Sequence, residues 1–165
     1  MKNVLFATLA GFMAGCSNPI SPTVDTSKER FPGELQSVVN FLREDSWRHP
    51  LLGGMSLAEY VEKHVAQAVY DPAVAKAGFG AYVLPGDPVL RWSPQHNIAN
   101  TGMEGIAGSL LHEARHFDGF PTHECGHRDC SMAEGGAYAV QILYLEHRGL
   151  MDVAAGLRRD AIGRW

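Results

Sequence analysis

His112-Glu113-Ala114-Arg115-His116 is the stretch around which the rest of the chain is organised. On a helix, residues four apart lie one turn apart on the same face, so the imidazoles of His112 and His116 can reach one metal ion. The residue after the first histidine then lies beside the open coordination position, where a metal-bound water would sit. We therefore expect Glu113 to act on that water as a general base.

The flanking residues predict that this stretch forms the last turns of a helix from about Gly102 to Asp118. Thr101 and Glu104 have the T-x-x-E spacing of a capping box, and Gly119 follows as a stop signal. A helical apolar stripe runs between these signals and consists of Met103, Ile106, Ala107, Leu110, Leu111 and Ala114. The two histidines flank the stripe, as a ligand pair at the wall of a cleft should.

A catalytic zinc ion usually has three protein ligands and one water, so the histidine pair requires a third ligand. His123 is the first candidate, because it follows the helix in a loop that begins at Gly119. Glu134 and His127 are the alternatives. Glu134 also lies three residues after Ser131, so helix capping alone would explain it.

Residues 1–15 have the form of a secretory leader, with Lys2 ahead of a short apolar run that is too short to span a bilayer. Small residues precede Cys16 as in a lipobox, which predicts lipid acylation at Cys16. Residues 16–30 contain prolines, serines and threonines and are interpreted as a tether. We expect a lipid-anchored protein of the bacterial cell envelope, in the outer membrane and facing the periplasm.

Composition favours one folded domain over residues 31–165. Removing residues 1–15 from the 165-residue chain leaves 150, which is the length of a single domain. The formal charge is -4 and no basic run is present, which argues against a nucleic-acid partner. With Cys16 acylated, Cys125 and Cys130 remain to form a disulfide in an oxidising compartment. A separate structural zinc site formed by these cysteines with His123 and His127 is the less favoured alternative.

The remaining patterns predict an α+β fold that is predominantly helical. Apolar residues with helical spacing follow Pro32. A second set follows a capping box at Ser56 and continues as far as Val69. His64 falls on that apolar face and is expected to be a packed core histidine. Two short runs, 81–84 and 89–92, predict a hairpin or edge strands. Two further helices are expected, a buried one that ends at His147 and a last one over 152–162 that buries Val153, Ala154, Leu157 and Ala161.

From Thr101 to Glu146 the chain resembles zincin-type metallopeptidases, and it is similar to small bacterial lipoproteins that carry a HEARH motif. Gly119 matches the glycine of the metzincin pattern HExxHxxGxxH, but His123 lies one residue beyond the third histidine of that pattern. The resemblance implies a zincin-like fold, in which an HExxH active-site helix lies beside an edge strand that binds extended peptide.

For function, the resemblance implies hydrolysis of peptide bonds in peptide or protein substrates, with Zn²⁺ as cofactor and Glu113 as the base that activates a zinc-bound water. Tyr138, or His127 if it is not a ligand, is the candidate to stabilise the oxyanion. The alternative is a non-catalytic envelope lipoprotein in which a structural zinc ion holds two helices together. The short chain motivates this alternative, because it leaves little material for a substrate-binding subdomain.

Overall fold

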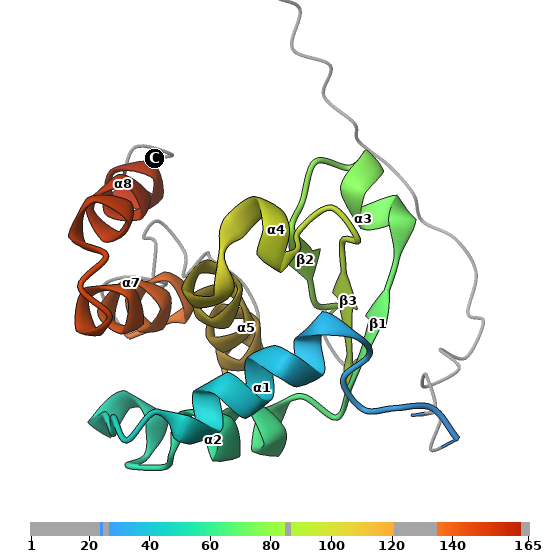
Figure 1. Cartoon of the computed structure of the whole chain (residues 1–165), viewed down its shortest axis with the longest axis horizontal. Helices are drawn as coiled ribbons and strands as arrows, with labels where there is room; N and C mark the ends of the chain where they lie inside the picture. The colour runs from blue at the N-terminus through green and yellow to red at the C-terminus, as the bar shows by residue number, and fades with distance from the viewer. Residues whose placement is uncertain (1–23, 25–26, 85–86, 121–134, 163–165) are drawn as a thin grey trace, which may run out of the picture.

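The computed structural model describes residues 24, 27–84, 87–120 and 135–162, and within them the fold is α+β and mostly helical (Figure 1). Three strands form one sheet in the order β1-β3-β2. None of the helices in these residues combines the length and the apolar character needed to span a bilayer. The elements are α1 (Glu34–Glu44), a 3₁₀ turn η1 (Pro50–Leu52), α2 (Leu57–His64), β1 (Gln67–Tyr70), α3 (Pro72–Lys76), β2 (Ala81–Tyr82), β3 (Val89–Trp92), α4 (Ile98–Thr101), α5 (Met103–Phe117), α7 (Ala137–His147) and α8 (Met151–Ile162).

Helix α5 lies at the centre of the fold. It packs against α7, α2 and α1, and it also contacts β2. Figure 1 shows α7 and α8 on one side of α5 and the sheet on the other. Because α5 is covered on several sides, it buries ten of its fifteen residues, including both histidines of the HEARH stretch.

The first two helices follow their sequence signals. Helix α1 buries the four apolar residues with helical spacing, which are Leu35, Val38, Val39 and Leu42. Helix α2 begins with the predicted capping box: the Ser56 hydroxyl accepts from the Glu59 amide at 3.2 Å, and the Glu59 carboxylate accepts from the Ser56 amide at 2.8 Å.

The predicted continuation of this helix to Val69 is wrong. Helix α2 ends at His64, and residues Gln67–Tyr70 form β1, which pairs in parallel with β3. The Arg30 side chain donates to the carbonyls of Glu62 and Val65, so it satisfies the C-terminal end of the helix. Arg30, which caps the helix, and β3, which pairs with β1, are both distant in sequence from this segment. The apolar residues of the segment fit the period of a helix as well as that of a strand.

The predicted hairpin is present. Strands β2 and β3 are antiparallel, with Ala81 opposite Trp92. Strand β3 is the central strand, so β1 and β2 are the two edges of the sheet. The edge formed by β2 lies beside α5.

The N-terminal boundary of the central helix differs from the prediction. Thr101 is the last residue of the short helix α4, and Gly102 separates it from α5 with a φ of 80°. The Thr101–Glu104 capping box is therefore not formed. Thr101 lies within 3.3 Å of His96 Nδ1, and Glu104 pairs with Arg148 at 3.5 Å. The C-terminal end agrees with the prediction, since Gly119 follows α5 with a φ of 85°.

The last two helices form the layer behind α5. Helix α7 is buried as predicted, and α8 buries Ala154 and Ala161 against the rest of the fold. Val153, which was expected to face inward, is 51% exposed. The buried side of α8 is narrower than its apolar pattern suggested, because α8 lies at the outside of the helical layer.

The capping box provides a test of the fold. Ser56→Ala should lower the free energy of unfolding by about 1 kcal/mol, because the Glu59 amide loses its acceptor. Urea denaturation of the two proteins measures this change. Ser37→Ala is the matched control, because Ser37 is exposed in the middle of α1 and its loss should change the stability by less than about 0.5 kcal/mol.

Candidate active site

Helix α5 brings the three residues of the predicted site together in a buried position. His112, Glu113 and His116 are each at most 8% exposed. The two imidazole centroids are 5.0 Å apart, and their planes meet at 77°. The i, i+4 spacing therefore places the rings side by side, as the sequence predicted.

The tautomer of His116 follows from its hydrogen bond. Its Nδ1 lies 2.6 Å from the carbonyl oxygen of Phe120, and a carbonyl can only accept. Nδ1 therefore carries the proton and donates, which leaves the Nε2 lone pair for a metal ion. Burial lowers the pKa of His116 and outweighs the hydrogen bond to Phe120, so the neutral form of the ring is favoured.

Glu113 is buried beside the two histidines. Its Oε2 atom has no hydrogen-bond partner within the described residues. Burial raises the pKa of the Glu113 carboxyl to about 8. An orphaned buried carboxyl oxygen requires an explanation, and a cation or a water held next to it would provide one. Two imidazoles, one of them oriented by a hydrogen bond, and a nearby carboxyl are the kinds of group found at a zinc site with a bound water.

A cleft of about 350 Å³ opens onto His112 and Glu113. Its walls come from the chain that leads into β2, the segment between β3 and α4, helix α5, and helices α7 and α8. The residues that line it are Gly78, Phe79, Gly80, Ala81, His96, Ser109, His112, Glu113, Tyr138, Gln141 and Leu157. Ala81 of the edge strand β2 thus lines the same cavity as His112 and Glu113.

Tyr138, the predicted oxyanion stabiliser, is part of this cleft. Its ring lies edge-on to the His112 ring, with centroids 4.7 Å apart. The structure therefore brings Tyr138 from α7 to the histidine pair, which is the placement that its proposed role requires.

His64 lies outside the cleft, in a packed position as expected. Its ring packs on Tyr60 with centroids 4.7 Å apart, and its Nε2 lies 3.6 Å from an Asp118 oxygen. Burial is the main cause of the lowered pKa of His64.

The sequence reasoning did not identify His96 and Ser109 as cleft residues. His96 Nε2 lies 2.9 Å from Ser109 Oγ, and Ser109 Oγ donates to the Gly105 carbonyl at 3.1 Å. Since the serine proton is used, His96 Nε2 must donate, and Nδ1 accepts from Thr101. Ser109 lies three and four residues before His112 and Glu113, so its helical spacing could have identified it. No local pattern marks His96.

Arg115 is a further residue whose role the sequence did not predict, although it lies inside the HEARH stretch. Its guanidinium donates to the carbonyl oxygens of Leu51 and Gly135, at 2.9 and 2.8 Å. It also pairs with Asp118 at 2.7 Å and lies over the Phe120 ring at 4.2 Å. Phe120 and Gly135 are the described residues on either side of 121–134. One buried cation therefore holds the chain at both ends of the segment that carries the candidate third ligands.

The remaining sequence predictions fall outside the described residues. His123, His127, Glu134 and the cysteine pair Cys125 and Cys130 lie within 121–134, and Cys16 lies within 1–23. The third ligand, the disulfide and the lipid anchor therefore remain predictions. Within the described residues, no group of three or more potential metal ligands is assembled, so the site there consists of the histidine pair and Glu113.

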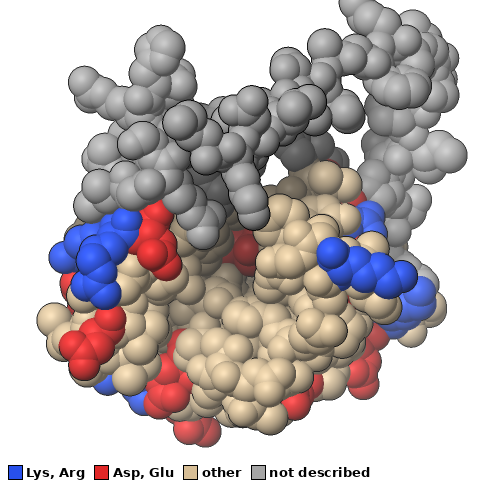
Figure 2. Space-filling model, turned by 90° about the horizontal axis from the view of Figure 1, so that it is seen from above, with Lys and Arg blue, Asp and Glu red and all other residues tan. Residues whose placement is uncertain are grey.

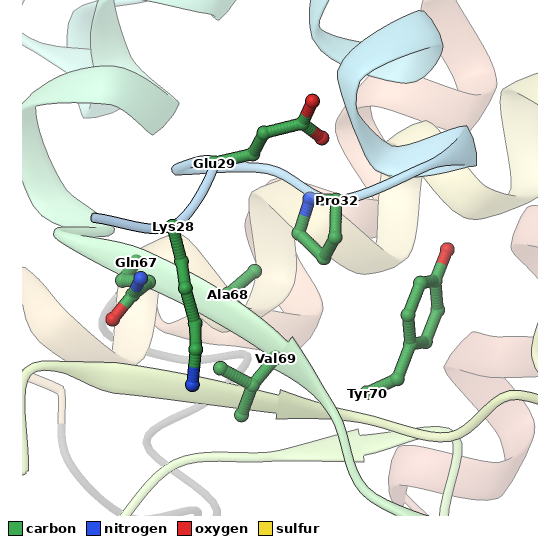
Figure 3. A pocket seen from close by; sticks show the side chains of 7 residues that line it. All are labelled: Lys28, Glu29, Pro32, Gln67, Ala68, Val69 and Tyr70. Atoms are coloured by element: carbon green, nitrogen blue, oxygen red, sulfur yellow. The ribbon is translucent and has the colours of Figure 1, made fainter. Parts of the chain in front are cut away.

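A second hollow of about 340 Å³ lies at the other edge of the sheet. Figure 3 shows that its walls come from the chain before α1 and from β1. Its lining residues are Lys28, Glu29, Pro32, Gln67, Ala68, Val69 and Tyr70, which include no histidine or cysteine. Because the strand order is β1-β3-β2, this hollow and the cleft beside β2 lie at opposite edges. Of these two hollows, only the cleft at α5 is lined by histidine among the described residues.

Charge on the surface is mixed. On the face shown in Figure 2, basic and acidic side chains alternate around the margin, and most of the middle consists of uncharged residues. This face has no continuous area of one sign that would steer a charged ligand.

Comparisons with protein-family models, with curated proteins and with solved structures found no match to this chain. The function must therefore be argued from the site itself.

The Arg115 network predicts a large effect on stability. Arg115→Leu leaves the carbonyls of Leu51 and Gly135 and the Asp118 carboxylate without their donor, so it should lower the free energy of unfolding by about 2 kcal/mol or more. Urea denaturation measures this loss. Arg43→Leu is the control, since it removes a surface pair with Glu62 that contributes at most about 1 kcal/mol. Equal losses in the two variants would show that the buried network contributes no more to the free energy of unfolding than the surface pair does.

Proposed function

We propose that this protein is a zinc-dependent metallopeptidase of the bacterial cell envelope that acts on peptide or protein substrates. The observation that carries the proposal is the buried Glu113 carboxyl, whose Oε2 lacks a hydrogen-bond partner within the described residues. It lines one cleft with His112, whose ring contacts that of His116. A purely structural helix would not need an unpaired acid at this place.

His112 and His116 would hold the zinc ion, and His123 is the proposed third ligand, ahead of Glu134 and His127. The Phe120 carbonyl supports the role of His116, because it fixes the tautomer in which Nδ1 carries the proton and Nε2 does not. When bound, zinc would supply Lewis acidity toward the carbonyl of the substrate and toward a water.

Glu113 performs the proton transfers. Its carboxylate accepts a proton from the attacking water and gives it to the leaving amine. The side chain suits this task because it lies at the cleft wall, next to the histidine pair and away from bulk solvent. Tyr138 donates its phenolic proton as a hydrogen bond to the oxyanion, which is supported by its contact with His112.

The proposed location and covalent state rest on the sequence. A lipid at Cys16 would anchor the chain in the outer membrane facing the periplasm, with residues 16–30 as the tether. A Cys125–Cys130 disulfide would form in that oxidising compartment. The fold proposed for residues 31–165 is zincin-like, with β2 as the edge strand beside the active-site helix.

Two variants distinguish the loss of metal binding from the loss of catalysis. His112→Ala should lose bound zinc, because it removes a ligand. Glu113→Gln should retain zinc while hydrolysis falls by roughly 10² or more, because it removes the base but keeps the shape. Elemental analysis of the purified proteins and a peptidase assay on a fluorogenic peptide mixture measure the two effects. A protein that retains zinc and hydrolyses nothing in its wild-type form would support the non-catalytic zinc lipoprotein instead.

The third ligand has its own test. His123→Ala should lose zinc as His112→Ala does, whereas Glu134→Gln should retain zinc and cost only a cap contribution of about 1 kcal/mol. Zinc content and thermal unfolding of the two variants give the result. Loss of zinc in Glu134→Gln, with zinc retained in His123→Ala, would assign the third position to Glu134 and reject His123.

A further inference from the structure

Gln141 is a polar residue in the middle of an apolar helix. The other buried residues of α7 are Ala137, Ala139, Val140, Ile142, Tyr144 and Leu145. Gln141 lies three residues after Tyr138, so the two share a face of α7, and both line the cleft. Its side chain crosses α5 at Gly108, where an added Cβ would lie 3.4 Å from Gln141 Cγ. Gly108 and His112 are four residues apart, so Gln141 lies over the turn of α5 that leads into the histidine pair.

The Gln141 amide has no use within the described fold. The residue is 9% exposed, and none of the described residues forms a hydrogen bond with its side chain. The amide atoms are not among the fully buried, unpartnered atoms of the described residues, so they reach the cleft that Gln141 lines. A methionine or leucine of similar volume would pack against Gly108 without carrying an unused amide. The position therefore carries a polar group that the fold does not use.

The chemistry of the cleft indicates what the amide can bind. Among the described residues that line the cleft, none is lysine or arginine, and Glu113 is the one acid. Burial lowers the pKa of His96, which favours its neutral form. An anionic ligand group would therefore find no counter-charge on the described walls. A glutamine amide offers N–H donors and a C=O acceptor side by side, which complements another neutral amide.

We propose that Gln141 binds a main-chain peptide group of the substrate, pairing its side-chain N–H and C=O with the C=O and N–H of the peptide. The inference builds on the proposed peptidase function, but it concerns recognition and not bond cleavage. Gln141 thus holds a stretch of peptide backbone against the α7 wall of the cleft.

Binding can be measured without hydrolysis. The mature chain carrying Glu113→Gln is titrated with the neutral peptide acetyl-Ala-Ala-Ala-amide, both zinc-loaded and zinc-free, and the side-chain amide resonances of Gln141 are followed by ¹H–¹⁵N NMR. The peptide should shift these resonances. Adding Gln141→Met should raise the dissociation constant about fivefold or more, the effect of losing one or two neutral hydrogen bonds. Zinc content should not change, and the stability should stay the same or rise.

Gln36→Met is the matched control, because it makes the same replacement on an exposed helix position. It should leave peptide binding unchanged. The second probe is N-acetylglucosamine, whose acetamide offers the same amide chemistry from a sugar, and it should not shift Gln141.

Three outcomes would overturn the inference: no peptide binding to the parent chain, equal binding by Gln141→Met and the parent, or a response to the sugar alone. Peptide binding that depends on Gln141 in a protein that neither retains zinc nor hydrolyses peptides would reject the proposed function and leave this inference standing.

Discussion

The buried guanidinium of Arg115 is the interaction on which the arrangement of the site depends. It joins α5 to the carbonyl of Leu51 after the first helix and to the carbonyl of Gly135 before α7, and its charge is balanced by Asp118. Gly135 suits this contact for two reasons: its φ is 70°, and a Cβ there would lie 2.7 Å from Leu51 Cδ2. A buried cation with four partners tolerates few alternative arrangements, so it fixes the position of α5 relative to the segments around it.

The geometry of the histidine pair follows from this placement. Arg115 and His116 are adjacent, and both contact Phe120: one through the aromatic ring and the other through the carbonyl oxygen. The residue that sets the tautomer of His116 is thus itself held by the neighbouring side chain. Along this stretch of α5, His112 and Glu113 line the cleft and the His116 ring contacts His112. Arg115 instead contacts the neighbouring segments at Leu51 and Gly135.

The sequence predicted the features that depend on local spacing. The capping box at Ser56, the α1 stripe, the hairpin and the pairing of His112 with His116 all follow from residues close to one another in sequence. It failed at β1, because that strand depends on pairing with Val89–Trp92 and on Arg30 ending α2. It missed His96 and Gln141 for the same reason: only the packing of α4, α5 and α7 brings these residues to the cleft.

The polar residues of the cleft lie where the fold would gain more from apolar ones. Helix α5 is buried on most of its surface, yet it presents Ser109, His112 and Glu113 to one cavity, and α7 adds Gln141 from the opposite wall. Each of these groups loses hydration on folding, and within the described residues the Glu113 Oε2 atom recovers no hydrogen bond. Proteins retain such unfavourable groups where activity requires them. Their gathering around one cavity, while the described lining of the hollow beside β1 has no histidine, is the physical reason why the proposed chemistry is assigned to α5.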